Sequence, residues 1–328
     1  SQDTRPTWSW VSGGGGSGNY RFNLDSNDFT GGGIATTATT FTPASLLTEG
    51  THTLFVQERD TANNFSLSGS FAITIDVTAP GAPVVSGVTP TTNTTPTWSW
   101  TSGGGGNGNY RFKLDNADFS VGATATTGTA FTPLAALTEG AHTLFVQESD
   151  AAGNFSAIGS FVITIDLTPP SAPNVSGTAS PTNDTTPTWT WTSGGGGNAN
   201  YRFKLDNADL STGATLTPLT SFTPITALVQ GPHTLFVQES DASGNWSVSG
   251  SFVVSIDITA PAAPVVTGTA SPTNDATPTW TWSSGGGGNG SYRMRLDNPD
   301  LSTGTTATTS TSFTPTVALS AGLHTLFV

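Results

Sequence analysis

The sequence predicts an all-β protein, a tandem array of antiparallel two-sheet sandwiches joined by proline-rich linkers. The first observation is a repeat, because a Trp-x-Trp segment followed by four glycines recurs at Trp8, Trp98, Trp189 and Trp280. A period of about 90 residues exceeds a solenoid unit of roughly 20 to 50 residues and matches one small domain. The second observation is that short apolar runs alternate with polar residues, with no helical periodicity. The third is that Gly, Pro, Asn and Asp separate these runs, as in turns.

The second repeat justifies the strands in order. Residues 97–101 place both indoles on one face and hydroxyl groups on the other. Residues 110–115 alternate apolar with charged side chains, and residues 161–166 alternate large apolar with smaller or polar ones. Both are period-two patterns of half-buried strands. Residues 130–132 and 142–147 add two further β-rich runs, and six or seven short strands per repeat fit a two-sheet sandwich.

The repeat divides the chain into four units, of which the first and the last lack strands. We expect repeat 1 at residues 1–79 without its first strand, repeat 2 at 80–169, repeat 3 at 170–260, and repeat 4 at 261–328 without its C-terminal strand. A sandwich without an outer strand exposes a hydrogen-bonding edge and part of its core. We therefore expect either that the sequence is a window on a longer protein or that a neighbouring subunit supplies the missing strand.

The order of motifs resembles fibronectin type III or bacterial immunoglobulin-like repeats. Those motifs are an early Trp strand, Tyr-x-Phe-x-Leu, His-Thr-Leu-Phe-Val, Asp-x-x-Gly-Asn and a final strand, with Ile-Asp-x-Thr-x-Pro joints at 75–80, 165–170 and 256–261. The resemblance implies the tandem arrays of large bacterial surface adhesins or extracellular filaments, and a cell-surface location. Two or three prolines in each joint favour an extended, semi-rigid connection, and hence a rod.

Composition limits the possible partners. The chain carries 22 acidic and 9 basic residues, for a net charge of −13, which disfavours nucleic acid and anionic lipid. There is no cysteine for disulfides or thiolate metal sites, and no apolar run approaches the roughly 20 residues of a membrane span. We expect no nucleic acid and no membrane insertion in this segment, and self-association or contacts between neighbouring repeats as the main interactions.

Recurring acids at the end of each repeat suggest calcium. Hard cations prefer several carboxylate and carbonyl oxygens, which loop acids beside joint acids could supply at a repeat boundary. The alternative is a plain hairpin, with the Asp accepting from backbone amides and Gly-Asn supplying the positive φ; Asn63 replaces the Gly in the first repeat. The candidate calcium ligands are Glu148, Asp150, Asn154 and Asp166, and the corresponding Glu239, Asp241, Asn245 and Asp257.

Two aromatic and glycine motifs have both structural and functional interpretations. The Trp-x-Trp pairs would stack on sugars if exposed, but nothing else in a repeat supplies a comparable core, so we expect them inside. The four-glycine loops at Gly13, Gly103, Gly194 and Gly285 lack the Lys and the helix of a phosphate-binding loop. They are either flexible hairpin tips or tips without side chains that let a neighbouring backbone approach closely.

No repeat contains a unique catalytic constellation. The four histidines, His52, His142, His233 and His324, open the same strand in each repeat without a nucleophile motif, and we expect them at the rim of the core. The acidic pair Asp115/Asp118, repeated in each unit, is expected to be a solvated turn. We therefore predict that the protein is not an enzyme.

The strand that begins with each histidine carries apolar residues on both of its faces. In residues 143–147, Leu144 and Val146 face one way and Phe145 the other, so one face keeps an apolar side chain outside the core. The residues in question are Phe55, Phe145, Phe236 and Phe327. We predict that they form a stripe for contact between rods.

These observations predict a structural repeat region of an extracellular surface protein, acting as the stalk of an adhesin or the shaft of a filament. The alternative is a multivalent module that binds surface glycans through exposed Trp-x-Trp pairs. The two predictions differ in whether the indoles are exposed.

Overall fold

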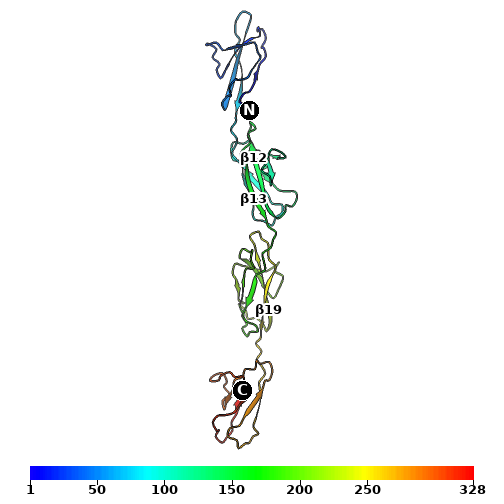
Figure 1. Ribbon diagram of the computed structural model, residues 1–328, viewed down its shortest axis with the longest axis vertical. Coiled ribbons are helices and arrows are strands. Elements are labelled where there is room, and N and C mark those ends of the chain that lie inside the picture. The colour runs from blue at the N-terminus through cyan, green and yellow to red at the C-terminus, as the bar shows by residue number, and fades with distance from the viewer.

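The computed structural model describes residues 1–328 as four β-sandwiches placed end to end in an elongated array (Figure 1). It contains no helix, and hence none that is long and apolar enough to cross a membrane. The mark for the N-terminus lies beside the joint between the first two sandwiches, and the mark for the C-terminus lies within the fourth (Figure 1). The prediction of an all-β tandem array of antiparallel sandwiches is confirmed.

The second and third sandwiches have the same two sheets. In the second, a four-stranded sheet has the order β10-β9-β12-β13 and faces a three-stranded sheet with the order β11-β8-β7. Its strands are β7 (Val84–Ser86), β8 (Trp98–Thr101), β9 (Asn109–Leu114), β10 (Thr124–Thr126), β11 (Ala130–Phe131), β12 (Gly140–Ser149) and β13 (Gly159–Ile165). The third sandwich repeats this order with β14 (Asn174–Gly177), β15 (Trp189–Thr192), β16 (Asn200–Leu205), β17 (Thr215–Thr217), β18 (Ser221–Phe222), β19 (Gly231–Ser240) and β20 (Gly250–Ile256).

The first and fourth sandwiches are reduced versions of the same plan. The first has the sheets β3-β2-β5-β6 and β1-β4, and the fourth has β21-β22-β24 and β23-β25. The strands of the first are β1 (Trp8–Ser9), β2 (Asn19–Leu24), β3 (Ile34–Thr36), β4 (Thr40–Phe41), β5 (Gly50–Arg59) and β6 (Gly69–Ile75). Those of the fourth are β21 (Val265–Gly268), β22 (Trp280–Ser283), β23 (Arg295–Leu296), β24 (Ser312–Phe313) and β25 (Leu326–Phe327).

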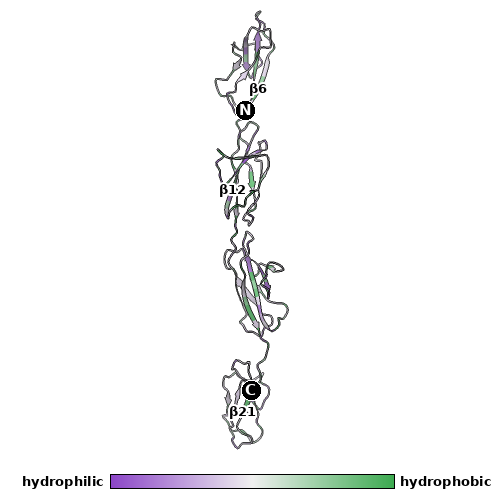
Figure 2. Cartoon of the chain, turned by 90° about the vertical axis from the view of Figure 1, so that its right-hand side faces the viewer, coloured by the Kyte–Doolittle hydropathy of each residue, from purple (hydrophilic) through white to green (hydrophobic).

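Strand alternation directs side chains as the sequence pattern predicts. On β12, Leu144 and Val146 are fully buried, while Phe145 between them faces outward opposite Lys113 and Ser160. Strongly hydrophobic residues lie on strands such as β12 and β21 (Figure 2). Because the side-chain period of a strand is two, this register fixes the core face of the whole sheet.

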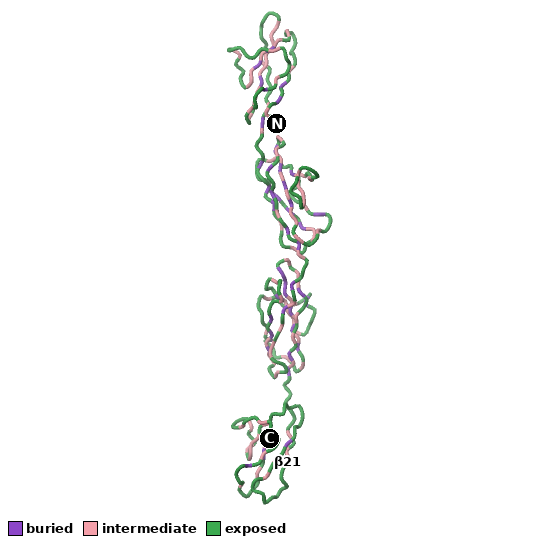
Figure 3. The backbone as a smooth tube through the Cα atoms, in the orientation of Figure 1, coloured by how far each residue is buried: buried purple, intermediate pink, exposed green.

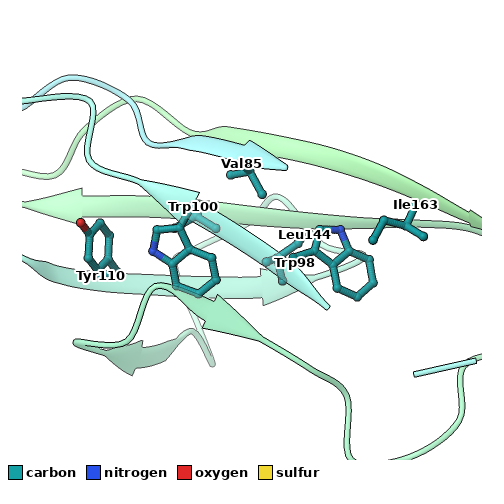
Figure 4. Packing of buried hydrophobic residues seen from close by; sticks show 7 residues of the cluster. Val85, Trp98, Trp100, Tyr110, Leu144 and Ile163 are labelled. Carbon is teal, nitrogen blue, oxygen red and sulfur yellow. The ribbon is translucent and has the colours of Figure 1, made fainter. Parts of the chain in front are cut away.

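The tryptophan pair fills the centre of each complete sandwich. Trp98 and Trp100 are 0% and 3% exposed, and with Val85, Leu144 and Ile163 they belong to one core cluster (Figure 4). The Nε1 of Trp98 donates to the carbonyl of Phe161 at 3.1 Å and so ties the two sheets together. Loss of a fully buried Trp side chain typically costs about 3–5 kcal/mol, so these indoles are the main anchors of each unit.

The buried residues concentrate in the middle sandwiches (Figure 3). The core cluster of the first sandwich contains three buried residues, against seven in the second and six in the third. The cause is visible in the sheet order, because the first sandwich has no strand corresponding to β7. Phe71 on β6 is consequently 68% exposed.

Candidate functional site

The joints between sandwiches are the parts of this chain where one unit can act on the next. Each joint starts at an aspartate whose carboxylate accepts from the amide of a threonine two residues later, as in the pair Asp76 and Thr78 at 3.1 Å. The Thr78 hydroxyl donates to Glu49 at 2.7 Å, and the Thr168 hydroxyl donates to Glu139 at 2.6 Å. These bonds hold the first half of the linker against the sandwich that it leaves.

The four-glycine loop of the next sandwich holds the second half of the linker. The Gly81 amide donates to the Gly104 carbonyl at 2.8 Å, and the two later joints repeat this bond from Ser171 to Gly195 and from Ala262 to Gly286. A Cβ added to Gly103 would lie 2.3 Å from the Ala82 carbonyl oxygen. The structure therefore favours the interpretation that these loops lack side chains so that a neighbouring backbone can approach.

The Asp-x-x-Gly-Asn loop forms the hairpin that was the alternative to a calcium site. One oxygen of Asp150 accepts from the Gly153 and Asn154 amides at 2.7 and 2.8 Å, and the other accepts from the Asn154 side chain at 2.8 Å. Gly153 has φ +95°, and Asn63 adopts φ +71° at the corresponding place in the first sandwich. Burial alone would raise the pKa of Asp150, but the bonds from Asn154 and the loop amides outweigh it and lower that pKa.

This hairpin also reaches across the joint. The Asn154 side-chain amide donates to the Asp76 main-chain oxygen at 3.0 Å, from the second sandwich to the end of the first. The next joint has the same bond from Asn245 to the Asp166 oxygen at 2.9 Å. There Ser243 adds a hydroxyl bond to the Asp166 carboxylate at 2.8 Å. Each hairpin amide thus serves its own loop and the preceding unit at once.

Of the candidate calcium ligands, the structure brings Asp166 to the hairpin of Asp241 and Asn245 across the second joint. Asp150 meets the joint of Asp76 and Asp166 meets the loop of Asp241, so Asp150 and Asp166 lie at opposite ends of one sandwich. Asp257 accepts from the Thr259 amide at the third joint. No group of three or more His, Cys, Asp or Glu side chains could hold a metal ion. This arrangement favours the hairpin alternative, and calcium binding is left to experiment.

The glutamates of the proposed ligand set serve another purpose. Glu148 is 1% exposed, and its carboxylate accepts from the Ser102 hydroxyl at 2.6 Å and from the Gly108 amide at 3.2 Å. A Cβ on Gly106 would lie 2.1 Å from the carboxyl carbon of Glu148. Glu239 is held the same way by Ser193 and Ala199. The buried glutamates therefore hold the glycine loops in place by hydrogen bonds and do not face the joints.

The histidines form a clamp that sequence reasoning missed. His142 lies 2.7 Å from the Asp115 carboxylate through Nδ1 and 2.9 Å from the Thr138 carbonyl through Nε2. The other Asp115 oxygen accepts from the Thr143 amide. The same arrangement occurs in all four sandwiches, in the pairs His52–Asp25, His142–Asp115, His233–Asp206 and His324–Asp297. The constant separation of 27 residues between Asp and His in every repeat was the signal.

This clamp favours the protonated form of the ring. Two acceptors face the two ring nitrogens of His142, and both nitrogens can donate only in the imidazolium form. The bond to Asp115 raises the pKa of His142, and the Thr138 carbonyl adds to that effect against the opposing effect of burial. Neither nitrogen is free to take a proton from a substrate, so the clamp has the chemistry of a structural pair. It ties the turn after β9 to the start of β12.

The structure also shows how far the phenylalanines of the predicted stripe and the tryptophans are buried. Phe55, Phe145, Phe236 and Phe327 are half-buried in each sandwich. Beside Phe145, the Arg111 guanidinium lies 3.6 Å from the centre of the Phe155 ring, a cation–π contact. Six of the eight indoles of the Trp-x-Trp pairs are buried, and Trp10 and Trp280 are half-buried. The structure therefore gives no support to a glycan module built on exposed pairs.

Comparison with known proteins adds little to these observations. No family model matches the chain, and no curated protein is found to match it. Among solved structures, the crystal structure of chicken CNTN1 FN1-FN3 domains aligns at 13% identity over 78% of this chain and 95% of that chain, with a TM-score of 0.33. The four- and three-stranded sheets of the chain itself define a tandem array of immunoglobulin-like, fibronectin type III-like sandwiches.

Proposed function

We propose that this chain is a structural repeat region of an extracellular surface protein, in bacteria, and that it forms the rod of an adhesin stalk or of a surface filament. The observation that carries the proposal is the hydrogen bonding across the joints, from Asn154 to Asp76 and from Asn245 to Asp166. Such bonds suit a protein whose task is to keep successive units in line.

Three features of the joints support a mechanical role. The linker is held on one side by the sandwich it leaves, through Thr78 and Glu49, and on the other by the glycine loop it meets, through Gly81 and Gly104. The prolines of the linker restrict its backbone further. Each complete sandwich has its own core, so stability is close to a sum of units and neighbour contacts. Added units then add length without a new fold.

Composition supports the proposed location. Only 9% of the residues are charged, and the exposed surface is largely Thr, Ser, Asn and Gly. No cysteine is present, so the stability of the chain does not depend on the redox state of its compartment. An antibody against the chain, applied to intact cells of the source organism, should label their surface. Labelling that appears only after lysis would contradict an extracellular location.

The form of the assembly is tested by electron microscopy of the native material. Thin beaded strands of constant spacing are the expected image of a stalk, and uniform fibres thicker than one sandwich are that of a filament. Compact particles, or strands that bend freely at every joint, would contradict both the stalk and the filament.

Contact between rods is the second part of the proposal. The half-buried phenylalanines provide an apolar element on the outer face of the four-stranded sheet. Phe145→Asp together with Phe236→Asp should shift native fibres toward single strands. Thr164→Asp together with Ser255→Asp, which adds the same two charges near the ends of β13 and β20, is the matched control. Fibres that survive the double substitution unchanged would exclude the stripe as a contact.

A further inference from the structure

The first sandwich carries a polar pocket at the β3 edge of its four-stranded sheet. The pocket has a volume of 440 Å³ and lies between the start of β2 and the end of β5. Its lining includes Arg21 and Arg59, beside Asn19, Thr36, Thr37 and Phe65. No acidic side chain lines it. Two positive charges therefore meet around one pocket, in a chain whose net charge is −13.

Strand register brings the two arginines together. β2 and β5 pair with Asn19 opposite Arg59, and two positions along Arg21 lies opposite Gln57. Arg21 and Arg59 are hence diagonal neighbours on the outer face of the sheet, at a separation of about 7–8 Å that long side chains can bridge. Neither forms an ion pair, because the salt bridges of the chain are the four His–Asp pairs. Both guanidinium groups are therefore without a negative partner in the protein.

Arg21 is held in place by its surroundings. Its guanidinium lies 3.6 Å from the centre of the Phe65 ring and 4.9 Å from that of Phe29. Its Nε donates to the Gln57 side chain at 2.8 Å, and its Nη1 donates to the Gly32 carbonyl at 3.3 Å. Its Nη2 donates to no group of the protein. A donor fixed in this way loses little conformational freedom when it binds a ligand.

The pocket involves residues that distinguish the first repeat from the second and third. The residues that differ are Arg59, where the later repeats have Ser149 and Ser240, and Gly33, where they have Ala123 and Ala214. The counterpart of Arg21 is unchanged, since Arg111 lies 3.6 Å from the centre of the Phe155 ring. The first repeat thus adds a charge and removes a side chain at one place in a conserved framework.

The neighbouring units leave this place open. In the second sandwich, β7 packs on β8 and β13, which correspond to β1 and β6, whereas the pocket lies at the opposite edge, beside β3. The bonds across the joint come from the Asn154 hairpin and the glycine loop. Arg111 and Ser149, the counterparts of Arg21 and Arg59, bond only within their own sandwich. This part of the sheet is therefore free even where another sandwich precedes it.

We propose that the pocket binds a carboxylated sugar, a uronic acid residue of an acidic polysaccharide. Arg59 and the Nη2 of Arg21 supply charge-assisted donors, and guanidinium groups match the geometry of a carboxylate. Asn19, Thr36 and Thr37 add amide and hydroxyl groups that can bond the hydroxyls of a sugar ring. The volume lies within the range of about 300–1,000 Å³ that is usual for small-molecule sites.

The neutral polar groups favour a sugar over other anions. Inorganic phosphate would use the two arginines but has no ring hydroxyls for the amide and hydroxyl groups beside them. An acidic loop of a second copy of the chain would likewise bring carboxylates alone. This inference goes beyond the structural role proposed above, because it gives the first sandwich a ligand of its own. It does not depend on that role, since binding is measured on the purified chain in solution.

The test is a calorimetric titration of the full chain with a galacturonic acid trimer. The methyl ester of the trimer keeps the rings and hydroxyls without the charge and is the ligand control. We expect one trimer per chain, no binding of the ester, and weaker binding as salt is added, because the interaction is between charges.

Two variants locate the site. Arg59→Ser should reduce the affinity for the trimer at least tenfold. Its unfolding temperature should match that of the original chain, because Ser149 and Ser240 occupy this position in the second and third sandwiches. Arg5→Ser removes the same charge from an exposed position outside the pocket and should bind the trimer like the original.

Four outcomes would overturn the proposal. The first is no binding at millimolar trimer, and the second is equal binding by Arg59→Ser or of the methyl ester. The third is inorganic phosphate that binds as tightly as the trimer, which would make the pocket a general anion site. The fourth is equally tight binding of a peptide of residues 113–120, which would assign the pocket to an acidic loop of a second copy.

Discussion

The side-chain amide of Asn154 lies 3.0 Å from the main-chain oxygen of Asp76, 78 residues earlier in the chain. The same amide also bonds the Asp150 carboxylate within its own hairpin. A turn that is ordered by its own hydrogen bonds therefore presents a donor to the preceding unit at no additional cost in side-chain freedom. The joint is rigid to the extent that this loop is rigid.

The first prediction concerns that bond. Asn154→Ala should widen the distribution of angles between the first two sandwiches, because the joint loses its bond between the hairpin and Asp76. Spin labels on the two sandwiches, read by pulsed electron resonance, measure the distribution. Asn64→Ala is the matched control, since Asn64 makes the same bond within its loop, to Asp60 at 3.1 Å, and lies outside the joint between the first two sandwiches. Equal distributions in the two variants would contradict this role.

The second prediction concerns the glycine loop. Gly103→Ala places a Cβ 2.3 Å from the Ala82 carbonyl oxygen, and overpacking of this kind usually costs about 1–3 kcal/mol. We expect faster hydrogen exchange at the Gly81 amide and a lower unfolding temperature. Gly13→Ala, at the equivalent position of the first loop, meets nothing within 4 Å and should change neither. A Gly13→Ala variant that is equally destabilised would show that the loop itself, not the linker, requires glycine.

The third prediction is a pH dependence from the histidine clamps. Hydrogen bonds to Asp115 and its counterparts raise the pKa of His52, His142, His233 and His324 above the ordinary 6.5. A raised folded pKa contributes stability that is complete below about 6.5 and is lost as pH rises through the folded value. Unfolding temperatures should therefore fall on the alkaline side of 6.5. The four imidazole titrations, followed by NMR, check this directly, and values at or below 6.5 would contradict it.

The fourth prediction is a loss of stability at acid pH, caused by the hairpin aspartates. The pKa of Asp150 and that of Asp241 are lowered from 3.8, because the hydrogen bonds of their loops outweigh the effect of burial. Their contribution is present above about 3.8 and is lost as pH falls through the lowered values. Unfolding measured between pH 2 and 5 should show this loss in the second and third sandwiches. Asp241→Asn should reduce this loss of stability in the third sandwich. An unchanged loss at acid pH would show that other carboxylates cause it.

The fifth prediction compares the two tryptophans of a pair. Trp98 Nε1 donates to the Phe161 carbonyl, whereas Trp100 Nε1 is buried without a partner. Trp98→Phe removes a hydrogen bond between the two sheets, which Trp100→Phe does not. We expect Trp98→Phe to be the more destabilising by about 1 kcal/mol. Chemical denaturation of the full chain measures both, and equal costs would show that the indole bond adds nothing to packing.

Calcium can be tested without any substitution. The oxygens of Asp150 already accept three hydrogen bonds from its own loop, and Asp166 lies at the far joint. We expect the same unfolding temperature in millimolar calcium and in excess chelator. A rise with calcium would instead support the ligand set that the sequence suggested.

The sequence by itself determined the strands, the turns and the core. Alternation over residues 110–115 and 142–147, and the indoles at Trp98 and Trp100, are local patterns. Each follows from which face of a strand a side chain takes. The hairpin at Asp150 was also foreseeable as an alternative, because Asp and Gly have turn preferences of their own. Such features need no knowledge of distant residues.

Only the tertiary structure decided which residues far apart in the sequence contact one another. The pairing of Asp150 with the joint of Asp76, rather than with Asp166, depends on which end of a sandwich each loop reaches. The clamp between Asp115 and His142 depends on two strands lying side by side. The role of Gly103 depends on the path of the linker in front of it. Contacts of this kind are set by the orientation of whole units, and composition and periodicity along the chain do not encode that orientation.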